Sequence, residues 1–187
     1  MLSMMSLSLA VVAAAVLVQI ASTIVWMFAP HHKSDYARLP DEDSARSALA
    51  PQNLQPGQYS MPHCASMEQM KDPETVARME SGPVAFITVL PKGMPPMGKN
   101  ILLTFVFYLA VGALIAYLAR LALPAGAAFW ETFRMVSATA WLAYGFAVVP
   151  DAIWYGRPWR NVAKLLFDAL VYALLTAGAF ASLWPSA

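Results

Sequence analysis

The sequence predicts an all-α membrane protein, with four transmembrane helices and a mostly irregular, partly helical polar segment between the first two. Three observations predict this fold class. Hydrophobic residues make up 59% of the 187 residues and charged residues only 12%, a balance typical of integral membrane proteins. Four stretches reach about 20 mostly apolar residues, the length that a helix needs to cross a bilayer. Seven of the twelve Lys and Arg and eight of the eleven acids gather in residues 30–99.

The first transmembrane helix is predicted over residues 6–28. A signal peptide is the alternative, but the opening MLSMM has no Lys or Arg. The apolar run is also longer than the hydrophobic region of a signal peptide. His31-His32-Lys33 follow it, and Trp26 suits the aromatic belt at a membrane interface. We therefore expect a retained helix.

The polar segment, residues 29–98, carries two helix signals. Three acids at positions 41–43 precede SARSAL, which places them near a helix N-terminus, where the helix dipole favours negative charge. Asp72 stands before Pro73 as an N-cap residue stands before a proline in the first helical position. This second helix should end before Ser81-Gly82-Pro83.

The rest of the polar segment is expected to lack regular structure. Residues 54–64 are rich in turn-forming residues, which predicts an irregular stretch. Residues 84–90, VAFITVL, are apolar but too short to span a membrane. They fit either a strand or a segment lying at the membrane surface. We favour the surface, because the second span follows closely.

The remaining transmembrane helices are predicted over residues 99–122, 128–149 and 161–184. The first of these contains Gly112 and Ala116, a pair of small residues four apart that lets another helix approach closely. Pro150 is expected to end the next, because proline disrupts a helix interior.

A ladder of alanines runs along the last span, at Ala169, Ala173, Ala177 and Ala181. Small residues at every fourth position form packing faces between membrane helices, where lipid supplies no hydrophobic drive for association. The ladder predicts a close contact between the last span and another helix.

Asp168 is the one acid deep in a predicted span. A carboxylate there costs about 2.5–3.5 kcal/mol on insertion scales and should face protein. We predict a structural, buried polar cluster that joins Asp168 to Tyr144, Tyr108 and Gln19, which lie at similar or somewhat greater depth. The alternative is a pair between Asp168 and Lys164, one helical turn away, whose ammonium reaches towards the interface.

The connection before the last span combines tryptophans with basic residues, namely Trp154, Arg157, Trp159, Arg160 and Lys164. Such a surface fits anionic lipid headgroups or an acidic loop of a partner. It fits equally an ordinary aromatic belt with the charges that orient a membrane protein.

The distribution of Lys and Arg predicts the orientation of the chain. With four spans both termini share one side, where Arg120 and Arg134 lie near the membrane. The other side carries Lys33, Arg38, Arg46, Lys92, Lys99, Arg157, Arg160 and Lys164. By the positive-inside rule, residues 30–98 are cytoplasmic and both termini lie outside.

Standard catalytic and metal motifs are absent from the sequence. His31, His32, His63 and Cys64 are the side chains that could bind a soft metal, but they match no zinc or haem pattern, and we expect surface histidines and no metal. Glycine-rich nucleotide loops and the hydrolase nucleophile motif are also missing. A net charge of +1 argues against nucleic-acid binding.

Several short motifs carry a resemblance to a known group of proteins. They are Trp26 before Pro30-His31, acids after a Leu-Pro, Pro56-Gly57-x-Tyr59-x-x-Pro62, and Gly82-Pro83 before an apolar run. In this order they resemble uncharacterised small four-helix membrane proteins of bacteria, which have one N-terminal span, a polar segment and three further spans. The resemblance implies a multi-pass protein of the bacterial inner membrane with periplasmic termini, and it implies no function.

Two functions follow from these features. The first is a non-catalytic accessory or structural subunit of a larger membrane complex, of respiratory or photosynthetic type, that contacts other subunits and anionic lipids. It requires no cofactor, although bound lipid is expected and a pigment or quinone stays open. The alternative is a small stand-alone transporter or membrane enzyme with a polar site around Asp168.

Overall fold

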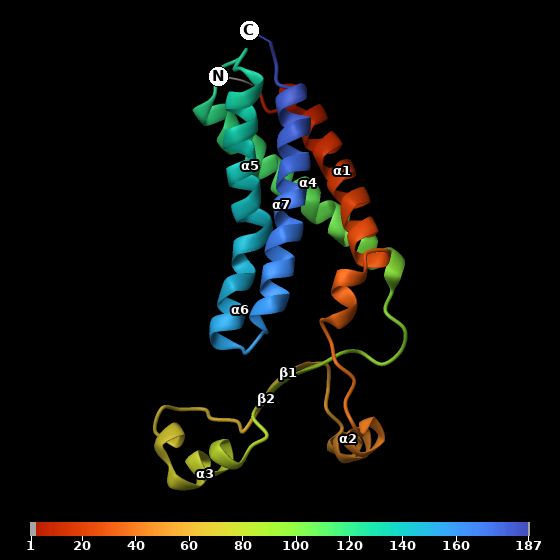
Figure 1. Ribbon diagram of the computed structural model, residues 1–187, viewed down its shortest axis with the longest axis vertical. Helices are drawn as coiled ribbons and strands as arrows, with labels where there is room; N and C mark the ends of the chain where they lie inside the picture. Colours follow the sequence, from red (N-terminus) through yellow and green to blue (C-terminus); the bar gives the residue numbers. More distant parts are fainter. Residues whose placement is uncertain (1–2, 187) are drawn as a thin grey trace. The chain divides into compact units, whose positions relative to one another are not determined.

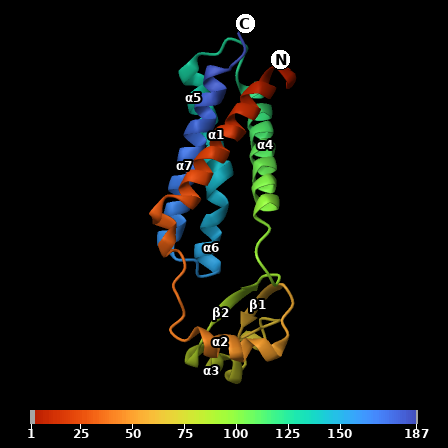
Figure 2. The same ribbon diagram turned by 90° about the vertical axis from the view of Figure 1, so that its right-hand side faces the viewer.

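Four helical spans in the described residues, 3–186, are long and apolar enough to cross a membrane. In this computed structural model they are α1 (Ser8–Met27, preceded by the 3-10 turn Met5–Leu7), α4 (Met97–Ala122), α5 with α6 (Phe129–Gly145 and Val149–Trp154), and α7 (Trp159–Ser182). The prediction of four apolar helices is therefore confirmed. Both ends of the described part of the chain lie at the same end of the bundle (Figures 1 and 2).

The third span continues past Pro150, so the prediction that this proline ends it is wrong. The short 3-10 turn Phe146–Val148 links α5 to α6, and Pro150 lies in the first turn of α6. Proline is tolerated there because the first N–H groups of a helix have no partner within it. The connection to α7 shrinks to residues 155–158, in which Gly156 adopts a φ of 69°.

Close approaches between backbones hold the bundle together. α7 packs most extensively against α5 and also against α1, which in turn packs on α4. A Cβ added to Gly145 of α5 would lie 2.8 Å from the Cβ of Ala169 on α7, and one on Gly112 of α4 would lie 3.2 Å from Val11 Cγ1. The ladder alanines Ala169, Ala173, Ala177 and Ala181 are all buried. This face of α7 therefore packs against helices of its own chain.

The chain divides into two compact units, of which the bundle is one and Ala37–Pro95 is the other. The second unit contains both helices that the capping signals predict, α2 (Glu42–Leu49) and α3 (Pro73–Ser81). The Asp41 carboxylate accepts a hydrogen bond from the backbone N–H of Ser44 at 3.0 Å, and that of Asp72 accepts one from Thr75 at 3.1 Å. Both helix starts are confirmed, whereas α3 runs one residue further than predicted and includes Ser81. A short 3-10 turn follows α2 at Ala50–Gln52, and another precedes α3 at Gln69–Lys71.

Parts of the two remaining segments form a small antiparallel sheet. β1 (Gly57–Met61) pairs with β2 (Ala85–Val89), in a register that runs from Gly57 opposite Val89 to Met61 opposite Ala85. The expectation of an irregular stretch is therefore wrong for β1, and of the two alternatives for residues 84–90 the structure shows the strand, which we did not favour. The β-branched run in β2 favours a strand, but its partner is rich in Gly, Gln and Ser and gives no such signal.

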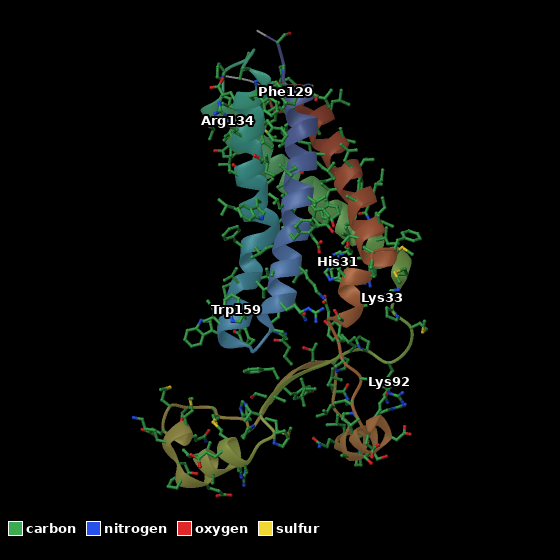
Figure 3. All side chains as sticks on the ribbon, viewed as in Figure 1. His31, Lys33, Lys92, Phe129, Arg134 and Trp159 are labelled. Carbon is green, nitrogen blue, oxygen red and sulfur yellow. The ribbon has the colours of Figure 1, made fainter. Side chains whose placement is uncertain are left out.

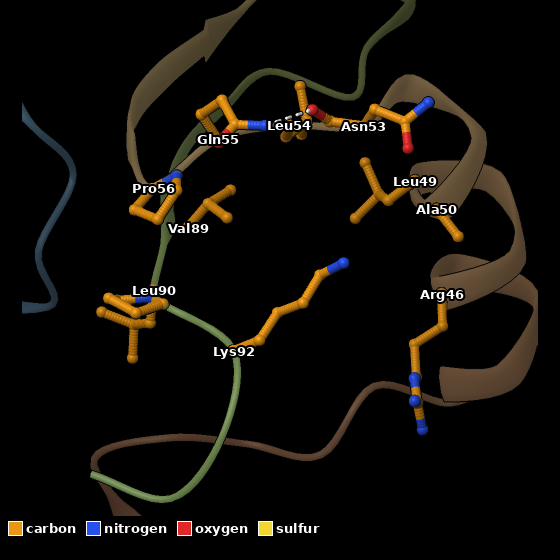
Figure 4. A pocket seen from close by; sticks show the side chains of 11 residues that line it. Arg46, Leu49, Ala50, Asn53, Leu54, Gln55, Pro56, Val89, Leu90 and Lys92 are labelled. Carbon is orange, nitrogen blue, oxygen red and sulfur yellow. Dashed lines mark hydrogen bonds between the residues drawn. The ribbon is translucent and has the colours of Figure 1, made fainter. Parts of the chain in front are cut away.

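A pocket of about 640 Å³ lies in the second unit, between α2 and the end of β2 (Figure 4). Lys92 extends into it and Arg46 stands at its side, and the rest of the lining is apolar or carries amides. Two cations with no acid or nucleophile beside them offer little chemistry, so the stronger candidate site lies in the bundle.

Candidate functional site

Asp168 on α7 is the centre of the candidate site. It is only 3% exposed, and it lies nine residues into its helix, about 14 Å from the helix start at 1.5 Å per residue. Its Oδ1 is 3.0 Å from Nε2 of His31, and its Oδ2 is 2.6 Å from Nε2 of His32. Figure 3 shows His31 beside α7, towards the end of the bundle opposite Phe129 and Arg134.

A tight turn brings both histidines to this carboxylate. α1 ends at Met27, and the chain then forms the 3-10 turn Pro30–Ser34, with Pro30 in its first position. The two imidazole rings lie side by side, with centroids 4.2 Å apart. The ring of His32 also stacks on Trp26, at 3.9 Å and an interplanar angle of 3°. The indole of α1 therefore fixes the plane of this imidazole.

A second carboxylate, Asp35, lies behind His32. Its Oδ2 is 2.6 Å from Nδ1 of His32, and its Oδ1 accepts a hydrogen bond from Nζ of Lys164 at 2.5 Å. Lys164 also donates to the backbone carbonyl of His31 and to Oγ of Ser34. Hydrogen bonds from Lys164 and His32 hold the pKa of Asp35 below its usual value. Asp35 is therefore a carboxylate at neutral pH.

His32 lies between two carboxylates, and this sets a chemical requirement. A neutral imidazole carries one N–H, so it donates at one ring nitrogen and offers a lone pair at the other. Both nitrogens are 2.6 Å from a carboxylate oxygen. One of these contacts is therefore between two acceptors unless a further proton, on the ring or on the carboxyl group, or a metal ion lies between them.

The rim of the site comes from the first turns of α7. Arg160 donates to Oγ of Ser34 at 3.2 Å, and the side-chain amide of Asn161 donates to the backbone carbonyl of Asp35 at 3.1 Å. His31 is the most open member of the cluster, with a side chain 32% exposed against 6% for His32 and 4% for Asp168. The site is therefore most open on the side of His31.

The residues predicted to form a cluster with Asp168 make their hydrogen bonds and ring contacts with other residues. Tyr108 and Tyr144 pack edge to face, with centroids 6.0 Å apart, and the Tyr144 hydroxyl is 3.5 Å from Oγ1 of Thr176. Gln19 donates to Oγ1 of Thr23 at 3.5 Å. In the described part of the chain, the hydrogen bonds of Asp168 go to histidines that follow α1. The structure corrects the predicted partners because the turn at Pro30 folds these histidines back against α7.

Lys164 differs from both of its expected roles. Its ammonium neutralises Asp35 rather than Asp168, and its side chain is only 13% exposed, so it does not face lipid. The rest of the basic aromatic connection stays at the surface. Trp154 and Trp159 are exposed, and Arg157 forms a surface ion pair with Asp151 at 3.4 Å.

The remaining candidate metal ligands lie in the other unit. His63 contacts Oγ of Ser60 through Nδ1 at 3.1 Å, and Cys64 is a free, half-buried thiol. By contrast, the structure places His31 and His32, expected to be surface histidines, against a buried carboxylate.

The sequence contains a signal that predicts the α7 half of this site. Polar residues recur at every fourth position of the last span, at Arg160, Lys164, Asp168, Tyr172 and Thr176. Positions four apart share a helix face that drifts slowly around the axis. The polar stripe therefore changes neighbours along α7. Lys164 and Asp168 contact the segment that follows α1, whereas Thr176 contacts Tyr144 of α5. No comparable signal identifies the histidines, because they lie in a short irregular turn.

The fold and the site together define a multi-pass helical membrane protein with an ionisable cluster where its first and last helices meet. Comparison of the chain with models of protein families, with curated proteins and with solved structures finds no match.

Proposed function

We propose that this protein acts on its own in the membrane as a cation-binding protein, with the cluster around Asp168 as its binding site. One observation carries the proposal: a buried carboxylate of the last helix contacts two imidazoles that follow the first helix. Ionisable groups inside membrane bundles are costly and commonly mark ion or substrate sites. A buried ion pair, in contrast, adds little to stability over well-packed apolar residues.

The charges of the cluster favour a cation over an anion. With neutral imidazoles, Asp168 and Asp35 contribute two negative charges and Lys164 one positive charge. Arg160 lies at the exposed rim, where solvent screens its charge. The buried part thus carries a net charge of −1, which is unfavourable away from water. A bound cation removes this charge.

The accessory-subunit hypothesis loses one of its supports and keeps another. The alanine ladder packs inside the chain's own bundle, so it offers no face to a partner. The third span, however, is the least buried of the four, and its apolar surface fits lipid or a neighbouring subunit. The charge asymmetry of the sequence supports cytoplasmic placement of residues 30–98, the side on which the histidines then open.

Mild extraction followed by native mass measurement tests the proposal. We expect a monomer or homo-oligomer of the 20.3 kDa chain. We also expect His32→Gln and Asp168→Asn to give folded protein, because both replacements keep the hydrogen-bonding shape. Recovery within a larger complex, together with loss of that complex in these two variants, would instead assign the cluster a structural role in an accessory subunit.

A further inference from the structure

We propose that the cation is a divalent first-row transition-metal ion of the Zn²⁺ or Fe²⁺ kind, held by Nε2 of His31, Nε2 of His32 and the carboxylate of Asp168. The inference rests on the proposed function and names the ligand class of the same site.

The three groups lie close to the spacing of a metal site. Their ligand atoms all lie within 4.8 Å of one another. Bonds of about 2.0–2.1 Å in tetrahedral geometry place ligand atoms about 3.4 Å apart. The contact from His31 to the carboxylate, at 3.0 Å, is close to this value. The 2.6 Å contact of His32 needs to open by less than about 1 Å, which a small rotation of the Asp168 carboxylate achieves.

The surroundings of His32 match the outer shell of a metal site. Metal-bound histidines commonly donate their other ring N–H to a carboxylate, which fixes the tautomer and the ring orientation. Nδ1 of His32 faces Oδ2 of Asp35 at 2.6 Å. With the proton on Nδ1, the lone pair of Nε2 points at Asp168. Lys164 holds Asp35 in place and Trp26 fixes the ring plane.

The donor set selects the class of metal. Imidazole suits Zn²⁺, Fe²⁺, Ni²⁺ and Cu²⁺, whereas Ca²⁺ and Mg²⁺ prefer oxygen ligands alone. Among the described residues the group of candidate ligands consists of two imidazoles and a carboxylate, with no thiolate. Three protein ligands leave a coordination position free, as in catalytic rather than structural zinc sites. The exposed side of His31 is where water or a substrate would reach that position.

Cobalt binding to the full-length protein in detergent tests the inference. After chelator treatment, we expect one equivalent of Co²⁺ to bind, with visible ligand-field absorption that Zn²⁺ abolishes by competition. His32→Gln and Asp168→Asn should each weaken binding at least tenfold. His63→Gln is the matched control, because this histidine contacts Ser60 and is not among the grouped ligands, and it should leave binding unchanged.

Asp35→Asn tests the outer shell separately. It removes no ligand, so the absorption spectrum should keep its shape while the affinity falls by about 10–100-fold. X-ray absorption of the wild-type protein with Zn²⁺ needs no variant and should show two imidazoles, oxygen and no sulfur.

Each other outcome would overturn the metal assignment. Folded wild-type protein that binds neither Co²⁺ nor Zn²⁺ would refute it, as would sulfur in the coordination shell or loss of binding in His63→Gln alone. These results would leave the proposed function standing if native mass still gives a monomer or homo-oligomer. The cation would then be a proton on His32, which also neutralises the net charge of −1 in the cluster.

Discussion

Exchanging a methyl group between α5 and α7 tests the helix contact that supports Asp168. Gly145→Ala places a new Cβ 2.8 Å from the Cβ of Ala169, whereas carbon atoms pack favourably at about 3.5–4.0 Å. The helices must separate by about 0.7 Å or more, and such overpacking costs about 1–3 kcal/mol of unfolding free energy. Leu166 Cδ2, at 3.2 Å from the new Cβ, is the end of a flexible side chain and can rotate away.

The second substitution, Ala169→Gly, should rescue the first. Alone it costs about 1 kcal/mol through helix propensity, but in the double variant it removes the clash. Thermal unfolding of the four proteins in detergent gives a coupling energy, expected at about 1–3 kcal/mol. Gly178→Ala is the control, because nothing lies within 4 Å of the Cβ it adds, and it should be neutral or slightly stabilising. A neutral Gly145→Ala, or additive single effects, would refute the close approach of α5 and α7.

Three further predictions concern single residues. Asp168→Leu should lower the yield and thermal midpoint of folded protein well below those of Asp168→Asn, because it leaves two imidazoles without their polar partner, at roughly 1–3 kcal/mol for each unsatisfied group; equal yields would contradict this. Hydrogen bonds from the side chain and backbone N–H of Ser44 lower the pKa of Asp41, so its capping of α2 is present above the unfolded-state pKa and is lost as the pH falls through the folded-state pKa. Hydrogen-exchange protection of α2, measured against Asp41→Asn as the reference, should therefore fall below about pH 4, and identical profiles for the two proteins would exclude it. Cys64, the single cysteine, should react with a membrane-impermeant thiol reagent only after cells are opened; labelling of intact cells would reverse the orientation.

Local patterns predicted the elements of this protein well. Four long apolar runs and two capped helices need only neighbouring residues for their recognition, and α2 with its Asp41 cap shows how a few positions suffice. The failures within elements have local causes as well. Pro150 signals the end of a helix, but the 3-10 turn before it lets a new helix start at the same place.

Long-range pairing accounts for what the sequence left open. The strand signal in residues 84–90 was ambiguous because its partner β1, far along the chain, has no strand-like composition. The partners of Asp168 were missed for the same reason. Residues at a similar depth in the predicted spans are tyrosines on neighbouring helices, so the prediction chose these. The observed partners, His31 and His32, lie in the turn after α1, and no sequence periodicity relates them to α7.

The separation of the site's two halves along the chain has a consequence for biosynthesis. His32 and Asp168 are 136 residues apart, so at 5–20 residues per second roughly 7–27 s pass between their syntheses. During that interval α1 and the turn with His31, His32 and Asp35 have been synthesised, but their partners on α7 have not. The cluster cannot guide insertion of the early helices, and it forms only when the last helix arrives beside the first. The cluster is therefore complete only once the last helix is in place, and in a chain that stops before α7 both histidines and Asp35 lack their partners Asp168 and Lys164.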